Sequence, residues 1–323
     1  MEKNINRIHS FDTFKAIAAI AVVFIHFGGF PIIGREVSVL SRFAVAYFFM
    51  VSGYFAYRID NNHIKRNIIK LSKLFLISAL LYIVYNIIKG GFFAIYKEIN
   101  FFNFIKVVLF NSPQISAPHL WYLLAIVYCY ILFYFFKRIK PKYLFLYVCS
   151  SLIIHLTIAE LLPIAFNINF VFTAPPIVRN AWLFGFPFFL LGFFAKKKEK
   201  AVLSISLMSV YSIFILGVII VLIEGMVIQT GILHDLYIGN VIMVISIFCF
   251  CIKNKAFGKN SLLEIVGNKY SLWIYILHPL VGNIICKTFH FDGYIFKWLM
   301  PILILFATVG VSALIVFAKR IKR

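Results

Sequence analysis

Charged residues are scarce in this chain, and acidic residues are the scarcest of all. Only 13% of its 323 residues are charged, with 32 lysines and arginines against 11 aspartates and glutamates. Hydrophobic residues make up 63% of the sequence and aromatic residues 18%, and the mean hydropathy is +0.95. This composition lies outside the range of soluble proteins and predicts an all-α, polytopic bundle of membrane helices.

Cysteine is also sparse, and its positions exclude a disulfide framework or a metal centre. All five cysteines fall within or at the ends of apolar runs, without metal-ligand spacing to histidine, so we expect small buried apolar side chains. They are Cys129, Cys149, Cys249, Cys251 and Cys286.

The net charge of +21 would suggest a nucleic-acid partner for a soluble protein. Here the charges lie in short loops between apolar runs, so membrane orientation explains them and no nucleic-acid partner is expected.

Apolar runs of about 20 residues predict ten membrane spans. They cover residues 11–29, 37–57, 71–88, 118–136, 143–162, 178–195, 201–224, 235–252, 265–285 and 298–318. Most of the 32 basic residues fall on every second loop, which predicts that both termini are cytoplasmic. The first run lacks the features of a cleavable signal peptide. Because the sequence shows neither repeats nor a soluble domain, residues 1–323 are expected to form one transmembrane domain.

Two outer segments are long enough to hold structure of their own. Residues 90–117 are aromatic and amphipathic, which favours a helix lying in the outer membrane interface. Residues 162–176 end in Pro175 and Pro176 and are predicted to form an irregular loop or lid.

The run from Phe11 to Phe30 is unusual because it carries Asp12, Lys15 and His26 among apolar residues. Ionisable groups inside a membrane are costly and usually mark a working site. On a helix, Lys15 and His26 lie about 16 Å apart along the axis and point to nearly the same face. Taken alone, the pair also fits a snorkelling lysine and an interior histidine.

Other polar residues are predicted to lie at the same depth as His26, near the outer ends of their spans. They are Arg42, His119 with Trp121, Arg179 with Asn180, and His278. Any one of them fits an interfacial anchor, but the whole set favours a shared pocket in the outer half of the bundle.

Basic residues also gather on the cytoplasmic side, before the third span. Lys65, Arg66, Lys70 and Lys73 have i, i+3 and i+4 spacings and therefore form one basic face of a helix. Such a face suits the phosphates of a nucleotide-bearing donor. The positive-inside signal and a contact with anionic lipid explain it equally well.

Five stretches together resemble the acyltransferase-3 family of ten-helix bacterial membrane proteins, which O-acylate cell-surface glycans. They are FDTFKAIAAIAVVFIH at 11–26, RFAVAYFFMVSGYF at 42–55, HLWYL at 119–123, RNAWLFGFPFFLLGFF at 179–194 and SLWIYILHPL at 271–280. The resemblance implies that His26 is catalytic and that Lys15 is its partner or helps to hold the donor. The family's paired arginines after the second span correspond here to Arg66, Lys70 and Lys73. Lysine cannot make arginine's bidentate phosphate contact, which weakens the assignment of donor binding to these residues.

The expected reaction moves an acyl group, most simply acetyl, from cytoplasmic acyl-CoA to a hydroxyl of an envelope polysaccharide or lipid-linked glycan. His26 would act as general base or carry the acyl group itself. Arg42, His119, Trp121, Arg179 and His278 are the expected substrate-binding residues. Acetyl-CoA is expected as a substrate, no cofactor is expected to bind tightly, and the multi-pass protein is expected in the cell membrane.

Two alternatives remain open at this level. The chain is also similar to the membrane half of serine racemases of glycopeptide resistance, which has been considered a substrate carrier, so an amino-acid or proton-coupled transporter is possible. A non-catalytic assembly or lipid-binding protein would explain the basic loops but not the histidines inside spans. The oligomeric state cannot be read from the sequence.

Overall fold

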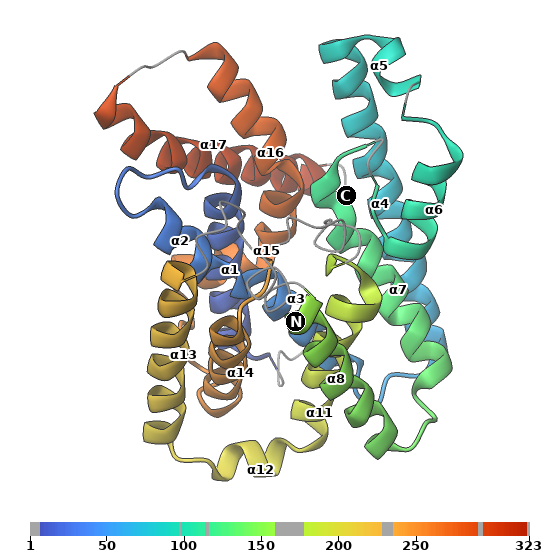
Figure 1. The fold of residues 1–323 in the computed structure, drawn as a ribbon, viewed down its shortest axis with the longest axis vertical. Coiled ribbons are helices and arrows are strands. Elements are labelled where there is room, and N and C mark those ends of the chain that lie inside the picture. Colours follow the sequence, from blue (N-terminus) through green and yellow to red (C-terminus); the bar gives the residue numbers. More distant parts are fainter. Residues whose placement is uncertain are drawn as a thin grey trace. The chain divides into compact units, whose positions relative to one another are not determined.

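The computed structural model describes residues 7–96, 98–113, 116–158, 178–227, 235–289 and 293–321. Within these ranges every regular element is a helix and no strand occurs (Figure 1). The chain separates into two compact units, one made of Met1–Phe48 with Lys198–Arg323 and one made of Phe49–Lys197. The boundary falls inside helix α3 (Phe43–Ala56), which therefore contributes to both units.

The first unit is built around α1 (His9–Phe27). Its partners include α2 (Gly34–Ser41), α14 (Ile238–Lys253), α15 (Leu262–Lys269), α16 (Ser271–Thr288) and α17 (Tyr294–Ile321). Helix α13 (Leu207–Val227) packs along α14. The short α12 (Glu199–Ser204) precedes α13 in the chain. The buried face of α1 is rich in alanine, which lets neighbouring helices approach closely.

Glycines mark two of these close approaches to α1. A Cβ atom on Gly267 of α15 would lie 1.7 Å from the carbonyl oxygen of Asp12. A Cβ atom on Gly282 of α16 would lie 2.2 Å from the ring of Phe27. Helix α15 is therefore held against the main chain of α1 at a distance that only glycine allows, whereas a Cβ atom at Gly282 would require the Phe27 ring to move.

The second unit contains α4 (Asn61–Gly90) packed along α7 (Trp121–Phe136), with α8 (Pro141–Leu156) and α11 (Phe186–Lys197) beside one another (Figure 1). It also holds the 3-10 turn η1 (Pro118–Leu120) and the π-helical turn η4 (Ala181–Gly185). Gly53 of α3 and Gly192 of α11 form a reciprocal contact. Their Cβ atoms would lie 1.7 Å from the oxygen of Phe189 and 1.9 Å from that of Met50.

Six helical segments are long and apolar enough to span a membrane by length and composition: His9–Phe27, Gly34–Ala56, Asn61–Gly90, Pro118–Phe136, Leu207–Val227 and Tyr294–Ala318. The all-helical, multi-pass expectation is thus supported, while the count of ten spans and the cytoplasmic termini stay predictions. The expected loop or lid at residues 162–176 lies outside the described residues.

Two predicted spans differ from the helices in the structure: one is interrupted and one begins late. The run 265–285 breaks at Tyr270, between α15 and α16. There the Ser271 hydroxyl donates to the carbonyl of Gly267 at 2.6 Å. In a continuous helix this carbonyl would accept from the backbone N–H of Ser271 instead. The run 178–195 starts late because the Asn180 side chain accepts from the amides of Trp182 and Leu183, which makes Asn180 the N-cap.

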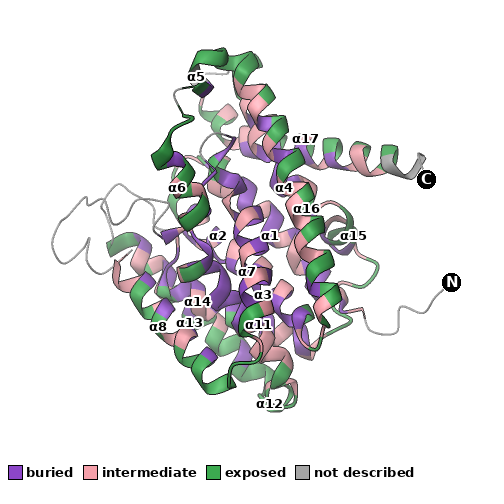
Figure 2. Ribbon diagram, turned by 90° about the vertical axis from the view of Figure 1, so that its right-hand side faces the viewer, coloured by how far each residue is buried: buried purple, intermediate pink, exposed green. Residues whose placement is uncertain are grey.

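The segment after α4 folds into two short helices, α5 (Phe92–Tyr96) and α6 (Phe101–Phe110). Figure 2 shows that exposed residues cover much of both, and Phe93, Phe101 and Phe102 are 81%, 70% and 75% exposed. Asn103 lies on the opposite, buried side and donates to the carboxylate of Glu98. The segment thus forms two short helices where the sequence predicts one, and its place in the outer interface stays a prediction.

The cysteines are all free thiols. Cys129 and Cys251 are buried and Cys149 and Cys249 are partly buried. Cys286 is exposed near the end of α16, so the expectation of burial is wrong for this residue.

Replacing Gly267 with alanine should destabilise the first unit, because the new methyl group would overlap the main chain of α1 at Asp12. We expect a loss of about 1 to 3 kcal/mol, the range for overpacked interiors, measured as a lower thermal unfolding midpoint in detergent. Gly310→Ala on α17 is the matched control, since its Cβ atom would meet nothing within 4 Å. Equal midpoints for the two variants would contradict the close packing of α15 on α1.

Candidate active site

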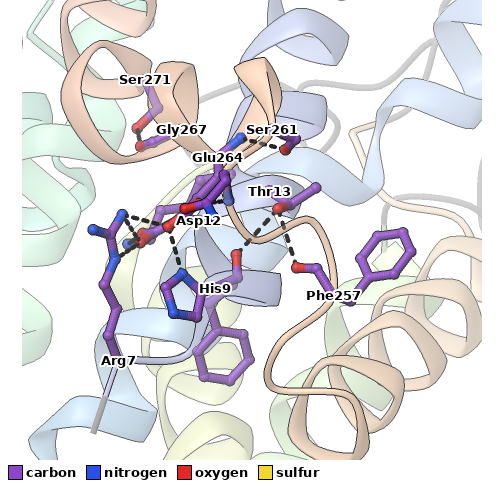
Figure 3. Close-up of polar contacts among 12 residues, drawn as sticks. Arg7, His9, Asp12, Thr13, Phe257, Ser261, Glu264, Gly267 and Ser271 are labelled. Carbon is purple, nitrogen blue, oxygen red and sulfur yellow. Dashed lines mark hydrogen bonds and ion pairs between the residues drawn. The ribbon is translucent and has the colours of Figure 1, made fainter. Parts of the chain in front are cut away.

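Charged side chains converge at the first turns of α1 (Figure 3). Asp12 accepts from Nε of Arg7 at 2.8 Å and from Nζ of Lys15 at 3.0 Å. Arg7 also reaches Oε1 of Glu264 on α15 at 3.0 Å, and Nδ1 of His9 contacts the same oxygen. We call Arg7, His9, Asp12, Lys15 and Glu264 the α1 ion cluster; it joins α1 to α15 through paired opposite charges.

The sequence of α15 fixes Glu264 in this cluster. Ser261 is the N-cap and accepts from the amide of Glu264 at 3.1 Å. The Glu264 carboxylate reaches back and accepts from the amide of Asn260 at 2.6 Å. The Ser-x-x-Glu spacing is a variant of the capping box. The sequence therefore held a local signal that Glu264 lies in the first turn of a helix, which our predictions did not use.

The charges around Glu264 determine its ionisation. Burial raises the pKa of the Glu264 carboxyl, but the hydrogen bonds from His9 and the Asn260 amide, with the charges of His9 and Arg7, outweigh it. The net result is a pKa below the ordinary value, so the carboxylate form is favoured in the folded protein.

Lys15 and His26 both lie on α1, as the sequence predicts. The continuous helix separates them by about 16 Å along its axis. The ammonium of Lys15 is paired with Asp12, so its charge is balanced at its own end of the helix. Direct proton exchange between Lys15 and His26 is excluded by this distance.

At the other end of α1, the structure brings His26 next to His278 of α16. The two imidazole centroids are 5.0 Å apart, with the ring planes inclined at 45°. His26 is exposed, whereas His278 is 0% exposed. An accessible imidazole beside a buried one is suited to proton transfer, with the buried ring as support.

Arg42 lies between α2 and α3 and is buried. Its Nη1 pairs with the carboxylate of Asp235 at 2.9 Å. Nearby, Glu224 of α13 accepts from the amides of Ile238 and Gly239 and so caps α14. The pairing of Arg42 with Asp235 had no signal in the sequence, because the two residues are far apart along the chain.

Three of the predicted substrate residues belong to the second unit. His119 is buried, with its ring centroid 4.8 Å from that of Tyr82. Trp121 contacts Phe49 and Phe184, at centroid distances of 6.2 and 5.6 Å. Arg179 is partly buried and directly precedes the N-cap Asn180.

The basic residues before the third span lie on α4, as predicted. Arg66, Lys70 and Lys73 are all exposed, and their spacing places them on one side of the helix. Lys65 lies over the ring of Tyr134 at 5.8 Å, a cation–π contact. The α4 basic face, defined as Arg66, Lys70 and Lys73, is therefore accessible to an anionic partner.

The first unit also holds an apolar cavity that the sequence did not indicate. Its volume is about 200 Å³. Its walls come from α1, α13, α14 and the turn after α14, with Phe14, Val210, Tyr211, Phe214, Ser246, Ile247, Phe250 and Phe257 as lining residues. This lining offers no ionisable group for catalysis at neutral pH.

Among the described residues, no group of three or more His, Cys, Asp or Glu side chains is placed to hold a metal ion.

The long apolar helices and the polar groups at their ends define a multi-pass membrane protein. A family model described as an acyltransferase domain matches residues 8–318. The chain belongs to the acyltransferase-3 family, which confirms the resemblance seen in its motifs.

Curated relatives carry a different name. An amino-acid racemase of Enterococcus faecalis is 27% identical over 307 residues, which cover 85% of this chain and 41% of the racemase. A second amino-acid racemase of Enterococcus faecalis is 28% identical over 222 residues, which cover 64% of this chain and 30% of that protein. The chain thus spans less than half the length of these relatives. No solved structure matches it.

Replacing Glu264 with glutamine should weaken the α1 ion cluster, because Arg7 and His9 lose their shared carboxylate partner. We expect a thermal midpoint lower by a few degrees at pH 7. Because the pKa of Glu264 is lowered in the folded state, its stabilising effect is present above the ordinary carboxyl pKa and disappears as pH falls through the folded value. The gap between wild type and variant should therefore close below about pH 4. A gap that stays constant with pH would contradict the assignment.

Proposed function

We propose that this protein is a membrane O-acyltransferase that moves an acyl group, most simply acetyl, from acyl-CoA to a hydroxyl of a cell-envelope glycan. Membership of the acyltransferase-3 family supports group transfer in general. The observation that carries the proposal is the pair of imidazoles formed by His26 and His278, in which His26 is exposed and His278 is buried beside it.

In the proposed step, His26 acts as general base. It takes the proton of the acceptor hydroxyl while the hydroxyl oxygen attacks the thioester carbonyl carbon. The new C–O bond forms, the C–S bond breaks, and the departing thiolate receives the proton and leaves as free CoA. A route in which His26 itself carries the acyl group for a short time uses the same nitrogen.

The donor is proposed to bind through its phosphates. The α4 basic face offers three exposed cations for them. Arg66 is its only guanidinium, while Lys70 and Lys73 act as point charges. Lys15 lies too far from His26 along α1 to act on it directly. We therefore propose that Lys15 helps to hold the donor.

The remaining predicted residues are proposed to serve the acceptor or the developing oxyanion. Trp121 and Arg179 are partly buried and suit stacking and hydrogen bonding with a sugar, while the buried His119 is proposed to support this part of the site. Arg42 is buried and has a carboxylate partner in Asp235, so its proposed contribution is to fix the start of α3. His278 is too deeply buried to bind a sugar, and its proposed role moves from substrate binding to His26.

A carrier of amino acids is the second candidate. It is favoured by the similarity to two proteins named amino-acid racemases, of which this chain matches only a part. A carrier would move its substrate without consuming a thioester, which separates it from the acyltransferase by experiment.

Replacing His26 with alanine should lower the rate of CoA release from acetyl-CoA, in the presence of an envelope glycan fraction, by about 10²- to 10⁴-fold. The measurement is thiol release by purified protein in nanodiscs at saturating donor. His63→Ala is the control, because His63 is an exposed histidine that pairs with Asp60. Full activity of His26→Ala, in a protein that folds normally, would disprove the base assignment.

Replacing Lys70 and Lys73 together with alanine should raise the KM for acetyl-CoA about five- to tenfold, with kcat little changed, because exposed charge contacts are individually weak. The double variant Lys140→Ala with Lys142→Ala removes the same charge from the exposed start of α8 and controls for net charge. If both double variants have the same KM, the α4 basic face does not bind the donor.

A further inference from the structure

Helix α16 contains a proline at position 279, directly after His278. Proline has no backbone N–H, so the carbonyl four residues earlier, that of Tyr275, loses its normal helical donor. A carbonyl without a partner inside a membrane protein is costly and calls for another donor.

His278 supplies that donor. Its Nδ1 lies 2.8 Å from the carbonyl oxygen of Tyr275 and 3.1 Å from that of Ile274. Carbonyl oxygens only accept hydrogen bonds, so Nδ1 must carry the hydrogen. In the neutral imidazole, the lone pair is then on Nε2, and His278 can act only as an acceptor through that atom.

The neighbouring residues hold the two imidazoles together. The centroid of His278 is 5.0 Å from that of His26, so a rotation of the exposed His26 ring can bring one of its nitrogens within hydrogen-bonding distance of Nε2 of His278. Phe27 packs edge-on against His278, with centroids 6.4 Å apart, and fits against Gly282 one helical turn further along α16. The register between α1 and α16 is therefore fixed directly beside His26.

We propose that His278 is the positioning residue of His26. When the His26 ring turns toward it, Nε2 of His278 accepts a hydrogen bond from one ring nitrogen of His26, which leaves the other nitrogen unprotonated and directed at the acceptor hydroxyl. The inference rests on the proposed role of His26 as base. Enzymes commonly orient a catalytic histidine with a carboxylate, whereas a neutral imidazole does so without placing a second charge inside the membrane.

Two substitutions separate this role from a purely structural one. His278→Gln keeps a polar atom near the position of Nε2 and can still accept from His26, but it loses the donor at Nδ1. His278→Asn keeps a donor near Nδ1 for the Tyr275 carbonyl but does not reach His26. We expect the glutamine variant to keep kcat within about threefold and the asparagine variant to lose about 10²-fold, the usual effect of misplacing a reacting group, both with an unchanged KM for donor.

A chemical readout tests the same point without acyl transfer. Diethyl pyrocarbonate modifies the unprotonated nitrogen of histidine, and mass spectrometry gives the rate for His26, with the exposed His63 as internal reference. A hydrogen bond accepted by His278 makes the unprotonated nitrogen of His26 more nucleophilic. The rate, relative to His63, should therefore be similar in wild type and His278→Gln and several-fold lower in His278→Asn.

The opposite order would overturn the proposal. If His278→Asn matches wild type in His26 modification, or if His278→Gln is no faster than His278→Asn, then His278 serves only the backbone of α16. The modification rates also separate this inference from the proposed function. A protein that never releases CoA but shows the expected order of rates would keep the His278 assignment and lose the acyltransferase.

Discussion

The balance of charge at the start of α1 is the interaction on which the first unit depends. A helix as apolar as α1 can hold Asp12 and Lys15 only if each charge has a partner, since unpaired charges in an apolar environment cost several kcal/mol. Asp12 lies between Arg7 and Lys15, and Arg7 continues to Glu264. This arrangement binds α15 to α1 through ions, at the point where Gly267 lets the two backbones touch.

The same helix separates two kinds of chemistry. Its first turns carry paired charges, and its last turn carries an imidazole whose neighbour is another imidazole. About 16 Å of buried, alanine-rich helix lies between them. Catalysis at the far end is thus proposed to rely on neutral groups, with the proton moved by His26 and the geometry set by His278. The proline after His278 links this geometry to the backbone of α16.

The sequence predicts much of the fold because apolar length determines where helices form in a membrane protein. The observed segment Pro118–Phe136 coincides with the predicted span 118–136. The interruptions at Tyr270 and Asn180 were missed because they depend on single side-chain hydrogen bonds, from Ser271 and to Asn180, which an average over 20 residues does not detect.

The candidate site was predictable only in part. Helical spacing placed Lys15 and His26 on α1, and the motifs singled out His278. That His26 and His278 meet could not be derived from spacing, because tertiary packing alone brings α1 and α16 together. Lys15 and Arg42 were predicted as site residues without their acidic partners. Helical spacing could have paired Lys15 with Asp12, three residues earlier, whereas only tertiary packing brings Asp235 to Arg42.

The most direct test of the account uses proteoliposomes that contain an envelope glycan fraction, supplied with acetyl-CoA labelled in its acetyl group and, in parallel, with labelled L-serine. We expect acetyl label to become covalently attached to the glycan in a protein-dependent manner, without accumulation of serine inside the vesicles. Accumulation of serine without any labelled glycan would contradict this expectation and would identify the protein as a carrier.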